Sequence, residues 1–446
     1  MTMIGVRPSV LAPGGLWQNW GRSARSHPVM MARPTNVDEV VSIVRFARDN
    51  GLTVKTVGAG HSFSAIAATD GIMLDLGWIE GLTAVDERLG RVTIGAGTNL
   101  FQLPTILAPY RLALTNVGDI DRQTIAGATS TGTHGTGARF GGLSTQIVGA
   151  TLVIGDGSIL KVSETEHPEL LPAVRLGLGA LGVIVDLTIQ CVPSFLLSAV
   201  ERPVGFDFVL DEFEEHSSAT DHFEFYWWPH TDGVMAKTNT RLPAEAERKP
   251  LRRINEFVED RVVSNGVLSV ICNVGHVAPF VIPAINRLAT RVYGNRSYTD
   301  HSHKVFVSPR TTRFREMEYA IPRAAVPEAI RAIRKLIEDH GWRISFPIEV
   351  RVAQADDNWL STAEGRDTGY IAVHRHYRDD PEQYFRAVEQ IMKGYGGRPH
   401  WGKMHYRDAE SLAESYPHFG DFLAVRDRLD PGRTFTNPYL DRVLGA

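Results

Sequence analysis

The chain has 446 residues, 43% of them hydrophobic and 22% charged, and its formal net charge is −4 at pH 7. This length favours two domains, and the composition is typical of a soluble globular protein. No block rich in lysine and arginine is present, which argues against a nucleic-acid partner. The chain has only two cysteines, Cys191 and Cys272, which cannot build a disulfide framework. The N-terminus lacks the apolar core of a signal peptide, so we expect a cytoplasmic protein.

The first 195 residues alternate between helix and strand signals. A helix is predicted to begin after Asn36, because apolar residues from Val37 to Ala47 recur at helical spacing, and to end at Gly51, a typical cap residue. Strands are predicted at residues 53–57, 72–76, 91–94, 147–154 and 183–189, where apolar runs are bounded by turn residues.

After Pro193 the pattern changes. An aromatic strand at 223–228 precedes a charged stretch, 241–261, that we expect to be a helix or an exposed connection. The later elements follow a β-α-β-β-α order, with predicted bounds 316–321, 327–340, 344–352, 370–376 and 381–395. This order predicts an α+β domain whose antiparallel sheet is covered by helices.

One stretch, residues 262–286, contains no Asp, Glu, Lys or Arg. Glycine, asparagine and proline interrupt it, whereas a membrane-spanning helix needs about 20 predominantly apolar residues. We expect this stretch to be buried core of the second domain, and weak association with a membrane surface is the alternative.

A glycine-rich turn follows the strand predicted at 53–57, in the order Gly58-Ala59-Gly60-His61-Ser62. Glycine lets backbone N–H groups approach a ligand closely, and consecutive N–H groups of this kind bind phosphate oxygens. A dinucleotide-binding G-x-G-x-x-G pattern occurs only at residues 177–182, where it precedes a strand instead of following one. A nicotinamide-binding fold is therefore disfavoured.

A second segment rich in glycine and hydroxyl side chains covers residues 116–120 and 124–137. Such backbone can lie flat against a planar cofactor and its pyrophosphate, although a run of turns would have the same composition. Glu349 and Arg351 lie two apart on a predicted strand and therefore share a face. They can form a substrate site or an ordinary solvated ion pair. The segment from His400 to Lys403 does not by itself indicate a functional site either.

Taken together, these segments resemble the aldonolactone oxidase branch of the vanillyl-alcohol-oxidase type of flavoproteins. The resemblance follows the family's order along nearly the whole chain and includes residues 58–62, 131–137, 179–184, 349–351, 400–403 and 429–431. It implies a two-domain PCMH-type FAD-binding fold, with an FAD-binding domain at 1–195, a substrate-binding cap at 196–400 and a segment, 401–446, that returns to the first domain.

The resemblance also implies roles for individual residues. His61 matches the histidine that bonds covalently to the 8α carbon of FAD, and Gly118 matches a position that controls access of O2. The residues expected to act on the substrate are Glu349, Arg351, Lys403 and His374. The residues expected to bind the cofactor are Gly58, Ala59, Gly60, His61, Ser62, Gly118, Asp119, Ser130, Gly132, Thr133, Gly135, Gly137, Gly182, Val183 and Ile184.

The implied activity is oxidation of an aldono-1,4-lactone of the L-gulono type at its C2 carbinol, with hydride transfer to flavin N5. Electrons would pass to O2 or to another acceptor such as cytochrome c, and the 2-keto lactone would enolise to an ascorbate-type product. Asp119 and His374 replace a serine and a threonine of the related alditol oxidases, which favours a lactone over xylitol or sorbitol. The proton acceptor is open among Glu349, His374 and water.

Two other classes of function compete with this interpretation. A metal site could form around the pairs His301/His303 and His374/His376, but no Cys, Asp or Glu at suitable spacing completes one, so no metal is expected. A non-catalytic flavin-binding protein is disfavoured because His61, Glu349, Arg351 and Lys403 are all retained.

Overall fold

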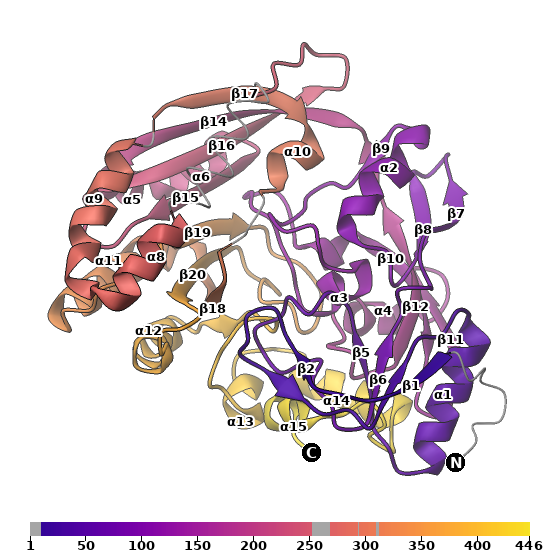
Figure 1. The fold of residues 1–446 in the computed structure, drawn as a ribbon. Helices are drawn as coiled ribbons and strands as arrows, with labels where there is room; N and C mark the ends of the chain where they lie inside the picture. The colour runs from indigo at the N-terminus through magenta and orange to yellow at the C-terminus, as the bar shows by residue number, and fades with distance from the viewer. Residues whose placement is uncertain (1–9, 252–267, 293, 309–311) are drawn as a thin grey trace.

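A computed structural model describes residues 10–251, 268–292, 294–308 and 312–446. The chain forms two bodies side by side, with the C-terminal segment lying beneath the first body (Figure 1). Helices and mostly antiparallel sheets are combined, so the predicted α+β class is confirmed.

The first body contains a four-stranded sheet of order β1-β4-β6-β5 and a five-stranded sheet of order β11-β10-β12-β8-β7. Helix α1 (Val37–Asp49) begins where the Asn36 side chain accepts a hydrogen bond from the N–H of Glu39, and Gly51 beyond its end has a positive φ of 63°. The strands of these two sheets are β1 (Leu11–Pro13), β4 (Met30–Ala32), β5 (Val54–Val57), β6 (Ile72–Asp75), β7 (Leu82–Asp86), β8 (Arg91–Gly95), β10 (Ile147–Val153), β11 (Ile159–Ser163) and β12 (Val183–Gln190).

Short elements connect these sheets. They are the strands β2 (Trp17–Gln18), β3 (Arg25–Ser26), β9 (Leu112–Ala113) and β13 (Val192–Pro193), and the helices α2 (Leu103–Leu107), α3 (Ile125–Ser130) and α4 (Leu171–Val174). Five predicted strands and the first helix of this body are confirmed, with ends shifted by one or two residues at most.

The second body is built on an eight-stranded antiparallel sheet of order β17-β14-β16-β15-β19-β20-β18-β21. Its strands are β14 (Phe195–Gly205), β15 (His222–Trp227), β16 (Gly233–Pro243), β17 (Arg296–His301), β18 (Phe314–Pro322), β19 (Ile348–Ala353), β20 (Thr368–His376) and β21 (Arg398–Pro399). Its helices are α5 (Phe206–Asp211), α6 (Phe213–Ala219), α8 (Leu268–Val277), α9 (Ile282–Val292), α10 (Ser302–Phe306), α11 (Val326–Asp339) and α12 (Glu382–Gly394). The predicted order β18-α11-β19-β20-α12 is confirmed, although β19 begins only at Ile348.

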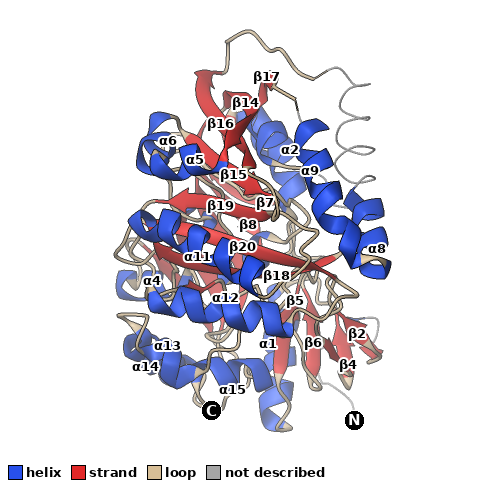
Figure 2. Ribbon diagram, turned by 90° about the vertical axis from the view of Figure 1, so that its left-hand side faces the viewer, coloured by secondary structure: helices blue, strands red, loops and turns tan. Residues whose placement is uncertain are grey.

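The two faces of this sheet differ sharply in chemistry. Helices α5, α6, α11 and α12 cover one face (Figure 2), and apolar residues such as Phe225, Met317 and Val350 point toward them. Because successive side chains of a strand alternate, their neighbours Glu224, Glu316 and others point to the opposite face. That face carries buried charged groups and is turned toward the first body.

Two predictions for the cap need correction. The stretch 241–261 begins as the end of strand β16, and its residues from 252 onward lie outside the described part. Residues 262–286 were expected to be buried core, which holds for only part of the described stretch: Cys272, Ile282 and Asn286 are buried, whereas Val277 is 83% exposed and Phe280 is 80% exposed. Helices α8 and α9 form a hairpin that buries Cys272 and Ile282 and leaves these other apolar residues in solvent.

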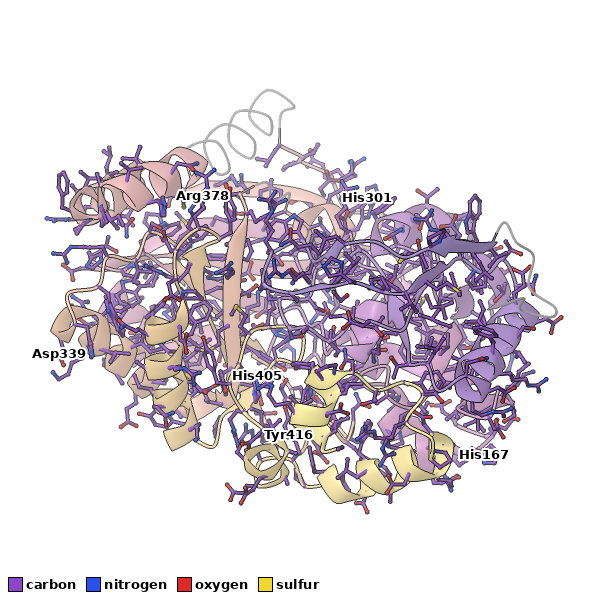
Figure 3. The ribbon with its side chains drawn as sticks, turned by 60° about the horizontal axis from the view of Figure 1, so that its bottom comes forward. His167, His301, Asp339, Arg378, His405 and Tyr416 are labelled. Carbon is purple, nitrogen blue, oxygen red and sulfur yellow. The ribbon has the colours of Figure 1, made fainter. Side chains whose placement is uncertain are left out.

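The C-terminal segment completes the first body. Its helices are α13 (Ala409–Ala413), α14 (Phe419–Leu429) and α15 (Pro438–Leu444), and their apolar residues belong to the same core cluster as α1 and β12. The amide of Asn437 donates to the carbonyls of Ala65, Ile66 and Ala68. His405, labelled in Figure 3, is buried and hydrogen-bonds through Nε2 to the hydroxyl of Tyr439. Among the described helices, none is both long and apolar enough to cross a membrane.

Candidate active site

Two cavities meet between the glycine-rich turn of the first body and the polar face of the cap sheet. The first cavity lies within the first body, and the second lies between this body and the cap. Four residues line both, namely His61, Ser62, Gln123 and Thr131. The arrangement suits an elongated ligand that passes from one cavity into the other at His61.

Several glycines line the first cavity and expose its backbone there. Strand β5 ends at Val57, and the following turn uses Gly60 with a φ of +67°. A Cβ atom at Gly58 would lie 2.5 Å from Oγ1 of Thr124, the residue that caps helix α3. Gly182, with a φ of +154°, lines the same cavity. Backbone of this kind, next to a helix N-terminus, is suited to the pyrophosphate and flat rings of a dinucleotide.

The predicted cofactor residues divide into two groups. Those that line a cavity are Gly58, Ala59, Gly60, His61, Ser62, Gly118, Asp119, Ser130, Thr133, Gly182 and Ile184. Gly132, Gly135, Gly137 and Val183 line neither of the two. At Gly135 a Cβ would lie 2.4 Å from the Val117 carbonyl oxygen, so close backbone packing by itself accounts for this glycine.

His61 stands at the junction of the cavities. Its ring stacks on Trp20, with centroids 5.5 Å apart and an interplanar angle of 26°. Burial lowers the pKa of His61 below its usual value, and the nearby cations Lys403 and Arg122 lower it further. The imidazole is therefore neutral at physiological pH, the state in which a ring nitrogen can act as a nucleophile.

Arg351 is the centre of a cluster of carboxylates in the second cavity. Its guanidinium donates to Glu349 on the same strand and to Glu224 on β15, 3.0 Å away, and lies 3.6 Å from Asp119. The Tyr226 hydroxyl donates to Glu349 at 3.1 Å. Glu349 and Arg351 are only 8% and 7% exposed, so the alternative of an ordinary solvated ion pair is wrong.

A second charged group is formed around Glu316 of β18. One carboxylate oxygen of Glu316 accepts from Nζ of Lys403, and the other lies 3.5 Å from Nε2 of His374. Nδ1 of His374 is 3.0 Å from the Pro347 carbonyl, which can only accept, so Nδ1 carries a proton. Burial alone would lower the pKa of Lys403, but the carboxylates of Glu316 and Glu318 outweigh it and raise that pKa.

Glu318, two residues along β18, faces two more histidines. Its carboxylate is 3.2 Å from Nε2 of His134, whose Nδ1 donates to the Gly135 carbonyl. His400 accepts a hydrogen bond on Nδ1 from the N–H of Gly402, and burial lowers its pKa to about 3. Because His400 is neutral and its Nδ1 accepts, its proton lies on Nε2.

The metal-ligating potential of the histidines also differs from expectation. Ligand atoms of His134, Glu318 and His400 lie within 4.8 Å of one another, as do those of His276, His376 and Asp379. The expectation that no carboxylate completes a group around the pair 374/376 is therefore wrong for His376. Glu316, which lies 3.5 Å from Nε2 of His374, is already bound by Lys403. Asp379 already binds His276 at 2.6 Å and lies 3.7 Å from the Arg375 guanidinium, a cation that disfavours a metal ion there.

Several cavity residues were not predicted. They include Trp20, Lys55, Gln123, His134, Tyr226, Glu316, Glu318 and His400. Glu316 and Glu318 had a usable signal, since they alternate with Met317 on a predicted strand, as Glu349 and Arg351 do with Val350. His134 lies in the predicted segment 124–137 and Tyr226 on the predicted strand 223–228, but their contacts with Glu318 and Glu349 join distant parts of the chain and could not be predicted.

Comparisons with known proteins agree with this geometry. Residues 187–443 match the D-arabinono-1,4-lactone oxidase family, and residues 28–163 match the FAD binding domain family. The chain is 44% identical over 432 residues to L-gulono-1,4-lactone dehydrogenase of Mycobacterium tuberculosis, covering 96% of this chain and 99% of that protein. It is 35% identical over 437 residues to L-gulonolactone oxidase of Bos taurus, covering 96% and 98%. Its fold is similar to that of cholesterol oxidase from B. sterolicum, with a TM-score of 0.82 at 17% identity over 100% and 99% of the two chains.

Proposed function

The chain belongs to the D-arabinono-1,4-lactone oxidase family, and we propose on that basis that it oxidises L-gulono-1,4-lactone or a close analogue at C2. It is an FAD-dependent oxidoreductase that acts on CH–OH groups. The observation that carries the substrate proposal is the buried polar face of the cap sheet, which meets the glycine-rich cavity at His61. We assign residues 1–195 and 401–446 to the cofactor domain and 196–400 to the cap.

Gly58, Gly60 and Gly182 of the first cavity would hold the pyrophosphate of FAD, and His61 would lie beside its ring system. When bound, FAD supplies a hydride acceptor, N5 of its isoalloxazine ring. We propose that His61 holds the cofactor covalently at 8α, because it is a neutral imidazole at the junction of the two cavities. Acid-denatured, washed protein that stays yellow supports this bond, and a colourless pellet contradicts it.

The charged groups of the second cavity have distinct tasks in this proposal. Arg351 supplies a fixed planar cation for negative charge that develops during oxidation. Glu349 accepts a hydrogen bond from the substrate hydroxyl and takes its proton as the C–H bond breaks. The alternative acceptor is His374, whose two ring nitrogens face Pro347 and Glu316. Lys403 adds positive charge beside the substrate oxygen.

The substrate class is tested by anaerobic bleaching of the flavin. The panel contains L-gulono-, L-galactono- and D-arabinono-1,4-lactone, with xylitol and sorbitol as competitors. We expect fast reduction by a lactone, which would release a 2-keto lactone that enolises to an ascorbate-type product. Reduction by polyols alone would replace this proposal with an alditol oxidase that forms an aldose and H2O2.

The electron acceptor is proposed to be O2 or a protein acceptor of the cytochrome c type. Gly118 lines the second cavity without a side chain, which leaves room for O2 beside the flavin site. The compared relatives are named both dehydrogenase and oxidase. Peroxide release, measured against cytochrome c reduction at equal lactone concentration, separates the two acceptors.

A cytoplasmic location fits the two free cysteines, both buried.

We further propose weak contact with a membrane surface through the hairpin of α8 and α9. Its residues Val277, Phe280 and Leu288 are 83%, 80% and 61% exposed. Co-sedimentation with anionic vesicles should decrease in Phe280→Ser and stay unchanged in Phe208→Ser, which removes an exposed phenylalanine from α5. Equal binding of both variants would contradict this contact.

A further inference from the structure

Glu316 links two side chains assigned to the substrate site, although no motif gives it a role. It lies on β18 next to His374 of β20, its direct partner in the sheet register, and it is 5% exposed. Its two carboxylate oxygens face different groups: Oε2 accepts from Lys403, and Oε1 lies 3.5 Å from Nε2 of His374.

Lys403 reaches this cavity from a different part of the chain. It follows strand β21, and its side chain is only 20% exposed. Its ammonium lies 5.4 Å from the centre of the Phe63 ring, which offers little hydration. A lysine at such a site stays protonated only if a carboxylate faces it. The titratable or charged groups around it are Glu316, Glu318, Asp119, His61 and His400.

We infer that Glu316 is a positioning residue that keeps Lys403 cationic and directed at the substrate, and that fixes the ring of His374 against Pro347. This inference rests on the proposed oxidation at the second cavity. Glu318 is the other nearby carboxylate of β18, but it is engaged with His134. Among these groups Glu316 is the one in direct contact with Lys403.

The variant Glu316→Gln separates charge from geometry. The glutamine amide can still accept from Lys403 and donate to His374, so the side chains keep their places while the negative charge is lost. Glu389→Gln is the matched control: Glu389 is also buried, but it binds Tyr319 and the N–H of Tyr406 on the helix-covered face of the sheet. Glu316→Asp keeps the charge and is the conservative rescue.

Two readouts are taken across pH. The first is the rate of anaerobic flavin reduction by lactone, and the second is labelling of Lys403 by an amine reagent, quantified by peptide mass spectrometry. In Glu316→Gln we expect a near-normal rate at about pH 6 and a loss, relative to the wild type, that grows toward about pH 9. A loss of about tenfold at a given pH corresponds to a Lys403 pKa about one unit below that pH. Labelling of Lys403 should begin at correspondingly lower pH. Glu389→Gln should keep both wild-type profiles, and Glu316→Asp should recover most of the rate at high pH.

Wild-type pH profiles in Glu316→Gln would overturn the inference. An equal loss at every pH would overturn it as well, because that result indicates a purely structural role. Failure of every lactone to reduce the wild-type flavin would instead refute the proposed function, so the two failures are distinguishable.

Discussion

Replacement of Arg351 by methionine is the sharpest perturbation of the proposed site. Methionine retains much of the side-chain bulk but removes a guanidinium that is 7% exposed and contacts Glu349, Glu224 and Asp119. Removal of one partner from a buried ion pair costs about 3–5 kcal/mol, because the remaining charges stay desolvated. The neighbouring carboxylates should respond by binding protons, so the free energy of unfolding should fall by less than the sum of the three contacts.

The chemical effect should be separable from this loss of stability. Loss of one preorganised donor to developing negative charge typically costs a factor of about 10²–10³ in rate, or about 2.7–4 kcal/mol. We expect Arg351→Met to retain covalent flavin and to lose flavin reduction by that factor in anaerobic stopped-flow experiments. Arg351→Lys should recover only part of the rate, since an ammonium cannot bind Glu349 and Glu224 with planar geometry.

Arg426→Met is the control for a buried arginine outside the site. Arg426 is 1% exposed and donates to the Gly445 carbonyl and to Thr436 within the C-terminal segment. This variant should lose stability and keep the wild-type rate of flavin reduction. The assigned role of Arg351 is refuted if Arg351→Met is reduced as fast as the wild type, or is slowed no more than Arg426→Met.

Three further outcomes are expected. His61→Ala should release its flavin on acid denaturation, as measured by absorbance of the supernatant. Gly118→Ala should slow peroxide formation without slowing anaerobic reduction, because the new methyl group would narrow the second cavity, where its Cβ would lie 3.3 Å from Cγ2 of Thr133. Burial, assisted by Arg426, lowers the pKa of Lys55 to about 7 in the folded protein. The unfolded chain therefore binds this proton more tightly than the folded protein does. As a result, the contribution of Lys55 to the free energy of unfolding increases as pH rises from about 7 toward 10. Lys55→Met should remove that part of the rise in Tm between about pH 7 and pH 9, whereas an unchanged rise would contradict the assignment.

Local sequence patterns predicted the parts of the fold that depend on near neighbours. Helix α1, strand β12 and the β18-α11-β19-β20-α12 run have clear periodicity and caps, and all are present. The long pair β14 and β16 was not predicted, because its register joins residues far apart in the chain, such as Phe195 and Pro243, which are 48 positions apart. The hairpin of α8 and α9 was mispredicted because absence of charge was taken as a sign of burial.

For the candidate site as well, local patterns predicted the positions of residues on a strand but not their partners. Period-two alternation placed Glu349 and Arg351 on one face, and the same rule applied to Glu316 and Glu318 would have added two carboxylates. The partners of these residues depend on tertiary structure. Glu224 meets Arg351 only because β15 pairs with β19, a contact that spans 127 positions in the chain.

The return of residues 401–444 to the first core has a consequence for biosynthesis. Domains usually fold in turn as they leave the ribosome, but here β5 gains the hydrogen bond from the Val54 N–H to the Thr434 carbonyl only after the cap has been translated. The hydrogen bonds from Asn437 to the carbonyls of Ala65, Ile66 and Ala68 also form only after this point. The nascent N-terminal half therefore cannot complete its core until the C-terminal helices have been translated.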